Sequence, residues 1–444
     1  MTDLTDVLTF ALDRAKAAGA DAAEAMVSDG TSVSVAWRLG RPEKVERAEG
    51  RDLGLRLFVG KRQALVSGTD VSRAGIEMLV ERAAAMARIV PEDPYCGLAT
   101  PDQLSQERPD LDQVDAEEPA AERLIALAEA AEDAARAVAG VTNSEGAEAS
   151  YSRGSTWIAT TAGFQGHQAY SRHGLSVSVL AGTGTAMERD YEWTTAVHAS
   201  DLDAPERLGR RAGERAVARL NPHKLSTGTR SVVFDPRVAR GLISHLTSAI
   251  SGPSIARGTS FLKEALGTQV FANGITIVED PFRRRGLRSR PVDSEGLAPV
   301  RRTLIDQGVL TTWLLDLRSG RQLGLPSTGH ASHGPGGLPS PSASNVWIEP
   351  GSVTPEELMA DIGDGLYVTD LLGMGINGVT GDYSRGAAGF RIVNGHLAEP
   401  VSEITIAGNL RTMFLALSVA NDLEFRAGID APTVRIDGMT IAGS

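Results

Sequence analysis

Apolar residues recur at helical spacing in four stretches of the first half of the chain. These stretches predict amphipathic helices over residues 4–18, 70–90, 119–138 and 205–220. Gly19 and Pro91 follow the first two as stop signals, and Asp70 is suited to cap the second at its N-terminus. The inward face predicted for this second helix consists of Val71, Met78, Leu79, Met86 and Ile89.

Alternating apolar and polar positions predict strands at 33–37, at 53–59 and in short runs between 141 and 200, such as 155–161 and 175–180. A strand at 231–234 is expected to lead into a helix from Pro236. Residues 301–305 and 309–315 are expected to form the two strands of a hairpin. Thr354 to Glu357 reads as a capping box that starts a helix. Residues 91–118 are expected to be irregular.

The helical and strand signals come in separate clusters, which favours the α+β class over a doubly wound parallel sheet. We predict two domains, with Lys224 to Thr229 at their boundary. Residues 1–222 would pack helices on a mostly antiparallel sheet. Residues 223–444 would form a β-rich domain with a few helices.

A glycine-dense stretch lies between an apolar run at 366–372 and a hairpin that turns at Asn394-Gly395. Glycines leave little bulk, so another backbone can approach such a loop closely. A loop flanked by strands also suits the capture of an extended peptide by strand addition. We predict that the loop contacts a peptide substrate or a partner through Gly381, Asp382, Tyr383, Ser384, Arg385 and Gly386.

Two familiar motifs are matched here only in part. Residues 373–378 fit GxGxxG, but no helical period follows and no acidic residue stands about 20 positions on, so a dinucleotide site is disfavoured. Ser384 lacks the first glycine and the strand-to-helix context of a nucleophile elbow.

Composition narrows the functional classes. The 444 residues carry a net charge of −12, which disfavours nucleic acid as a general partner. Cys96 is the only cysteine, so an intrachain disulfide is excluded and a reducing compartment is expected. The acidic amino end has no signal-peptide pattern, and no apolar run reaches membrane-spanning length. We therefore expect a cytoplasmic protein that does not bind membranes.

Three segments of the second half resemble one known family. The longest reads GVTGDYSRGAAGF and continues into VNGHLAEPVSEITIAGNL. A second begins with GPSIAR at Gly252, and a third is VRIDGM at the carboxyl end. These segments are similar to the PmbA/TldE family, also called modulators of DNA gyrase. The resemblance is dense from about residue 232 onward.

The resemblance implies a metal-free subunit of a heteromeric zinc metallopeptidase. In such a complex a TldD-like partner holds zinc through a helical HExxxH motif and a cysteine near its carboxyl end. At the matching helix this chain has Ser244, His245 and Ala249, and no cysteine follows Cys96. No histidine of the chain is followed by glutamate. Hydroxyl groups bind zinc poorly, so we expect no catalytic residue and no metal or other cofactor here, with the zinc in the partner.

The subunit would complete the chamber around the partner's zinc and hold extended peptides for maturation or degradation. One alternative is a homodimeric peptide-binding or scaffold protein, a pseudo-peptidase without a catalytic partner. Another is an enzyme with an unfamiliar site built from Asp382, Tyr383, Arg385 and His245.

Two polar clusters remain. His330 and His333 lie in a glycine-rich segment, where we expect a mobile loop over a groove rather than a metal site. Arg283, Arg284 and Arg285, followed by Arg288 and Arg290, suit a grip on a substrate carboxylate or an acidic partner. A solvated loop is an equal alternative for this basic cluster.

Overall fold

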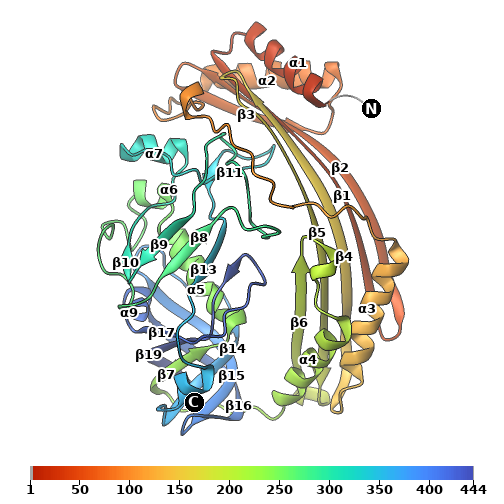
Figure 1. The fold of residues 1–444 in the computed structure, drawn as a ribbon, viewed down its shortest axis with the longest axis vertical. Coiled ribbons are helices and arrows are strands. Elements are labelled where there is room, and N and C mark those ends of the chain that lie inside the picture. The colour runs from red at the N-terminus through yellow and green to blue at the C-terminus, as the bar shows by residue number, and fades with distance from the viewer. Residues whose placement is uncertain (1–3, 444) are drawn as a thin grey trace.

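The computed structural model describes residues 4–443 (Figure 1), so residues 1–3 of the acidic amino end lie outside it. The N-terminal half forms one antiparallel six-stranded sheet in the order β3-β2-β1-β4-β5-β6. Its strands are long and bend around the C-terminal half of the chain (Figure 1). They are β1 (Ala22–Arg38), β2 (Arg41–Val59), β3 (Arg62–Gly68), β4 (Val141–Thr160), β5 (Gln165–Ala181) and β6 (Glu188–Ala196).

The short runs predicted between 141 and 200 are wrong in length. The runs at 155–161 and 175–180 are parts of β4 and β5, which pair from Val141–Ala181 to Ala159–Gln165. Turns were expected between these runs, yet residues such as Arg172 and His173 continue the alternation of buried and exposed positions. Polar side chains at alternate positions are compatible with an uninterrupted strand when one face borders another domain.

Two helix pairs cover the ends of this sheet (Figure 1). At one end α1 (Leu4–Ala17) and α2 (Arg73–Ile89) enclose an apolar core with β1, β2 and β3. At the other end α3 (Ala121–Arg136) and α4 (Pro205–Ala218) pack on β4, β5 and β6. The connection between α2 and α3 is irregular, as predicted, apart from the short η1 (Pro101–Gln103). Two further short turns are η2 (Gly184–Ala186) and η3 (Ala199–Asp201).

The predicted cap and inward face of α2 need correction. Ser72, not Asp70, is the N-cap, because its side chain accepts a hydrogen bond from the Gly75 N–H (3.1 Å). Met78 and Ile89 are 64% and 83% exposed. The buried face consists of Gly75, Ile76, Leu79, Val80, Ala83, Ala84 and Ala87. Small alanines let this face approach the sheet closely, so the larger methionines are left outside.

The C-terminal half is mixed and β-rich, which confirms the α+β class. One sheet has the order β16-β15-β14-β7-β19-β17, with β16 also pairing to β19. Its strands are β7 (Gly228–Phe234), β14 (Asp364–Leu372), β15 (Asp382–Val393), β16 (His396–Asn409), β17 (Leu417–Val419) and β19 (Val434–Ala442). Within it, β7 and β14 run parallel.

A second sheet of this half has the order β10-β9-β8-β13-β18 and shares one apolar core with the first. Its strands are β8 (Ile277–Asp280), β9 (Arg302–Asp306), β10 (Val309–Leu310), β13 (Asn345–Ile348) and β18 (Ile429–Asp430), beside a separate pair of β11 (Ala331–Ser332) and β12 (Ser340–Pro341). The helices are α5 (Pro236–Ala249), α6 (Gly252–Ala256), α7 (Leu317–Leu323), α8 (Pro355–Met359) and α9 (Leu410–Leu415). No helix among residues 4–443 is both long and apolar enough to cross a membrane.

The Asn394-Gly395 turn is confirmed, and the loop predicted before it is corrected. Asn394 and Gly395 both have positive φ (49° and 80°) and connect β15 to β16. Residues 382–386, however, belong to β15. They pair with β16 on one side and meet Leu372 or the segment around Gly375 on the other. Both hydrogen-bonding sides of this stretch are therefore occupied, so strand addition is not available there.

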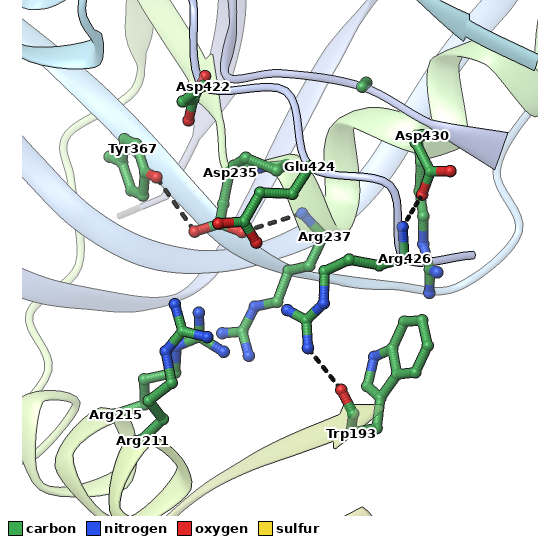
Figure 2. Close-up of a pocket in the computed structure, with 13 residues that line it drawn as sticks. Trp193, Arg211, Arg215, Asp235, Arg237, Tyr367, Asp422, Glu424, Arg426 and Asp430 are labelled. Carbon is green, nitrogen blue, oxygen red and sulfur yellow. Dashed lines mark hydrogen bonds between the residues drawn. The ribbon is translucent and has the colours of Figure 1, made fainter. Parts of the chain in front are cut away.

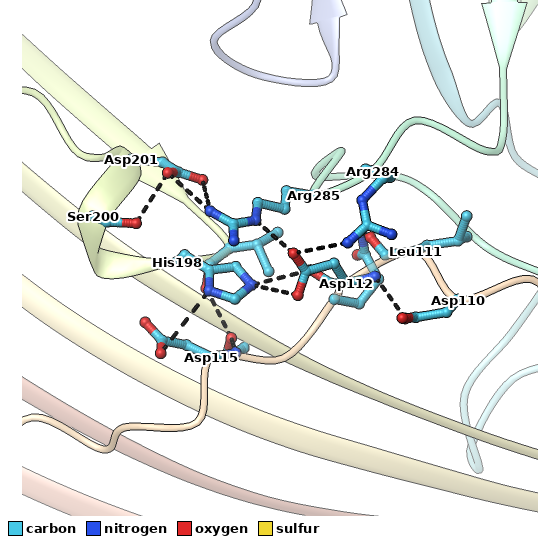
Figure 3. A network of polar contacts seen from close by, with 12 residues as sticks. Asp110, Leu111, Asp112, Asp115, His198, Ser200, Asp201, Arg284 and Arg285 are labelled. Carbon is cyan, nitrogen blue, oxygen red and sulfur yellow. Dashed lines mark hydrogen bonds and ion pairs between the residues drawn. The ribbon is translucent and has the colours of Figure 1, made fainter.

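The basic cluster joins the two halves of the chain (Figure 3). Arg285 donates to Asp112 (2.7 Å) in the irregular connection and to Asp201 (3.1 Å) after β6. The His198 ring lies 3.1 Å from the same Asp112 carboxylate. Arg283 instead stacks on Phe425. Arg284 and Arg285 are thus paired with carboxylates of the chain itself, which the expected grip on a substrate or partner did not anticipate.

A buried carboxyl group in the C-terminal half predicts an unusual pH dependence. Glu295 is almost completely buried and accepts a hydrogen bond from the Leu317 N–H (2.8 Å). Burial, helped by the neighbouring Asp293 charge, raises the pKa of Glu295 from 4.5 to about 8. The folded protein thus keeps a proton that the unfolded chain releases above pH 4.5. The free energy of unfolding should therefore fall as pH rises through this window, by up to about 1.4 kcal/mol per pH unit.

Glu295→Gln is the test, since glutamine keeps an acceptor for Leu317 but cannot ionise. Urea unfolding at a series of pH values should show a shallower decline for the variant, which becomes the more stable protein at alkaline pH. If the free energy of unfolding fell equally with pH in both proteins, the raised pKa of Glu295 would be contradicted.

Candidate functional site

Helix α5 forms one wall of a cavity between the two halves of the chain. The helix starts where Asp235 caps the Arg237 N–H (3.0 Å) and Pro236 occupies the first turn. Leu242, Ile243 and Leu246 face the core. The other face carries polar groups toward the cavity.

The cavity has a volume of about 450 Å³, and we call it the α5 pocket. Besides α5, its walls come from β6, β14, β15 and the loops around residues 288 and 427. Its polar lining consists of Tyr191, Arg237, Arg240, Ser244, His245, Arg288, Asp370, Tyr383 and Arg385. The apolar lining includes Phe234, Val238, Leu242, Leu371 and Ile429.

Positive charge dominates this lining. Arg237 is neutralised by Asp190, which it contacts at 2.6 and 3.0 Å, and Asp370 lies 3.5 Å from Arg219. Arg240, Arg288 and Arg385, in contrast, form no ion pair with any carboxylate among residues 4–443. The pocket therefore carries uncompensated cations.

Those arginines are held by other contacts. Arg385 donates from Nε to the Leu372 carbonyl (3.2 Å) and from Nη2 to that of Leu371 (3.3 Å). Arg288 donates from Nε and Nη2 to the Ala343 carbonyl (3.2 and 3.0 Å). Arg240 lies over the Trp193 ring, 5.0 Å from its centroid. Carbonyl and ring contacts fix the guanidinium groups without neutralising them.

His245 and Tyr383 stay uncharged near neutral pH. Burial, assisted by the Arg385 charge, lowers the pKa of His245 to about 4. Burial raises the pKa of Tyr383 to about 12. The two rings meet edge to face with centroids 6.1 Å apart. A neutral imidazole and a phenol supply hydrogen bonds here but no compensating negative charge.

The predicted contact residues divide between two faces of β15. Tyr383 and Arg385 line the α5 pocket, whereas Asp382 and Ser384 are exposed on the opposite face. Asp382 accepts hydrogen bonds from Asn409 (3.0 Å) and Thr380 (2.6 Å). The alternation of a strand explains this separation.

The two predicted glycines, Gly381 and Gly386, have roles in the backbone conformation and in close packing. Gly381 adopts a positive φ of 85°, and its carbonyl accepts from the Leu410 N–H (2.7 Å). Gly386 lies against Leu372. Neither lines the pocket. The sequence reading missed Arg237 and Arg240 on α5, although their spacing with Ser244 marks one helical face.

A second cavity of about 230 Å³ adjoins the first and shares Arg237 and Arg240 with it (Figure 2). We call it the Trp193 pocket. Arg215 pairs with Glu192 (2.6 Å), and Arg426 pairs with the same carboxylate (2.9 Å). Tyr367 donates to Asp235 (3.1 Å). This lining holds both signs of charge, since it includes four carboxylates, whereas the α5 pocket has one.

The expectation of a mobile loop at His330 and His333 is wrong. The His330 ring is buried, with Nε2 2.6 Å from a Glu279 oxygen, and His333 lies 3.5 Å from Glu24. Pro335 packs directly against Gly54 of β2. The acidic partners are distant in sequence, which hid these pairs. Among residues 4–443, no three His, Cys, Asp or Glu side chains come together as a metal site.

The environment of His245 can be tested by NMR titration. We expect its ring signals to stay unchanged from about pH 8 to about pH 5.5, because burial and Arg385 disfavour the imidazolium. Arg385→Gln should raise the pKa of His245, and His245→Gln identifies its signals. A midpoint near the ordinary 6.5 in the unmodified protein would contradict the buried, cationic setting.

Comparisons with known proteins cover nearly the whole chain. Models of the PmbA/TldA metallopeptidase match domain 1 at residues 23–87, the central domain at 114–220 and the C-terminal domain at 227–443. Metalloprotease PmbA of Escherichia coli O157:H7 is 40% identical over 442 residues, 99% of this chain and 96% of that protein. The PmbA homolog of Haemophilus influenzae is 38% identical over 100% of this chain and 96% of its own length.

Solved structures agree with the fold. A protein of Bacteroides thetaiotaomicron described as a modulator of DNA gyrase superposes with a TM-score of 0.92 at 25% identity, covering 100% of both chains. TldE of Thermococcus kodakarensis superposes with a TM-score of 0.86 at 20% identity, covering 99% of this chain and 100% of that one.

Proposed function

The chain belongs to the PmbA/TldD metallopeptidase family, and on that premise we propose that it is a non-catalytic, metal-free subunit of a two-component zinc metallopeptidase. It completes the chamber around the zinc of a TldD-like partner that carries HExxxH. It also holds extended peptides there for maturation or degradation. The assembly works in the cytoplasm.

The composition of α5 carries the proposal. A helical zinc site needs two imidazoles on one face and a carboxylate to handle the water proton. Toward the α5 pocket this helix presents Arg237, Arg240, Ser244 and His245. The resemblance aligns the zinc helix of TldD with α5, so Ser244 and Ala249 stand at the two histidine positions and His245 at the position of the glutamate. Arginines next to a ligand position repel a divalent cation.

The contact site for peptide lies in the α5 pocket rather than along residues 381–386. Strand addition there is blocked by existing pairing, as described above. Tyr383 and Arg385 remain available from the predicted set, now as side-chain contacts. The pocket lies between the two halves of the chain, a common place for ligand sites.

Co-purification tests the proposal. This chain is expressed with an HExxxH homologue from the same genome, and the complex is sized and its zinc is measured for each separated chain. We expect a stable heteromer in which zinc stays with the HExxxH chain. Stoichiometric zinc on this chain alone would overturn the proposal. A homodimer that ignores the homologue would favour the scaffold alternative instead.

A further inference from the structure

We infer that the α5 pocket is a carboxylate-binding site that recognises an acidic group of the bound peptide, either its C-terminal carboxylate or an Asp or Glu side chain. This inference rests on the proposed peptide-holding function and specifies its substrate class. It draws on the excess positive charge of the pocket, on its shape and on the fixed position of its arginines.

Three cations border the α5 pocket. Arg240 comes from α5, Arg288 from the loop after β8 and Arg385 from β15. They originate more than 40 residues apart in sequence, so the fold alone brings them together. An arginine fork matches a carboxylate in geometry as well as charge.

No carboxylate of the described residues pairs with these three arginines. Asp370 is the only carboxylate among the described residues that line this pocket, and it lies 3.5 Å from Arg219. Asp190 already forms an ion pair with Arg237. The structure therefore leaves the three guanidinium groups that border the pocket without an acidic partner, a place that the carboxylate of a ligand can take.

The remaining lining favours a small organic anion on a peptide. Phe234, Leu242 and Ile429 offer apolar contact beside the charges. The Ser244 hydroxyl and the neutral His245 ring provide further hydrogen-bonding groups. A volume of about 450 Å³ is in the range of small-ligand sites and suits the end of a peptide or one acidic residue.

Calorimetric titration of the full-length chain with three synthetic octapeptides tests the inference. All share one neutral sequence. The first has a free C-terminal carboxylate, the second is amidated, and the third is amidated with a single internal Glu. We expect the first, the third or both to bind about tenfold or more tightly than the second, as one charge-assisted contact requires. The peptide that binds more tightly than the amidated neutral one shows whether the C-terminus or a side chain supplies the carboxylate.

Arg240→Gln should abolish this difference, and Arg240→Lys should retain part of it. Arg385→Gln provides a second loss variant. Arg82→Gln, which removes an exposed arginine of α2 far from the pocket, should leave the difference unchanged. Melting curves confirm that each variant is folded.

The outcomes separate the two proposals. Equal affinity for all three peptides, or a preference that survives both Arg240→Gln and Arg385→Gln, overturns the carboxylate site and leaves peptide holding intact. No binding of any peptide, by the chain alone or with its HExxxH homologue, overturns both.

Discussion

Replacing Asp190 by alanine is expected to lower the free energy of unfolding by about 3–5 kcal/mol. Asp190 is 2% exposed and lies on β6, where it accepts two hydrogen bonds from Arg237 of α5. Arg219 approaches the same carboxylate at 3.3 Å. Alanine would leave the buried Arg237 guanidinium without its carboxylate partner, whereas Arg219 keeps Glu188 and Asp370 nearby. An unpaired buried charge costs more than a buried pair contributes.

Chemical denaturation measures this effect, and the neighbouring pair on the same strand is the matched control. Arg189 contacts Glu145 at 3.2 Å with both side chains about half exposed. Glu145→Ala should therefore cost less than about 1 kcal/mol. If Asp190→Ala and Glu145→Ala lowered the free energy of unfolding equally, Asp190 would not be what holds β6 to α5.

Replacing Glu279 by alanine is expected to have an effect of similar size, about 3–5 kcal/mol. Glu279 is buried on β8 and accepts from His330 Nε2 (2.6 Å) and the Ser344 N–H (2.5 Å). Burial alone would raise its pKa, but these hydrogen bonds hold the pKa of Glu279 below its usual range. Alanine leaves both buried nitrogens without an acceptor.

Two measurements check this second prediction. Denaturation gives the loss of stability, and hydrogen exchange should show faster opening across residues 326–344, which Glu279 ties down. Asp306→Ala, at an exposed position on the adjacent strand β9, is the control and should change neither. Unaltered exchange in residues 326–344 of Glu279→Ala would contradict the account.

Local signals in the sequence predicted the elements that depend on local chemistry. The Asn394-Gly395 turn requires two positive-φ residues, and the helix after Pro236 has a cap and an apolar stripe next to each other in sequence. The α+β class followed from the same kind of pattern. The turn and the helix are each specified by neighbouring residues, so no tertiary contact was needed to predict them.

The candidate site was only partly predictable because its parts meet through the fold. Tyr383 and Arg385 were anticipated, but Asp382 and Ser384 of the same segment face away from the pocket. The segment was read as a loop because its glycines suggested freedom, whereas pairing with β16 makes it a strand. His330 seemed mobile because its partner Glu279 is 51 residues away.

Reconstitution from separately treated chains shows which of the two chains must carry the zinc. This chain and its HExxxH homologue are purified apart, each is stripped with a chelator that is then removed, and zinc is returned to one of them before mixing. We expect peptide cleavage only when the homologue carries the zinc, with no activity from either chain alone. Cleavage by this chain alone after zinc loading, without the homologue, would contradict it.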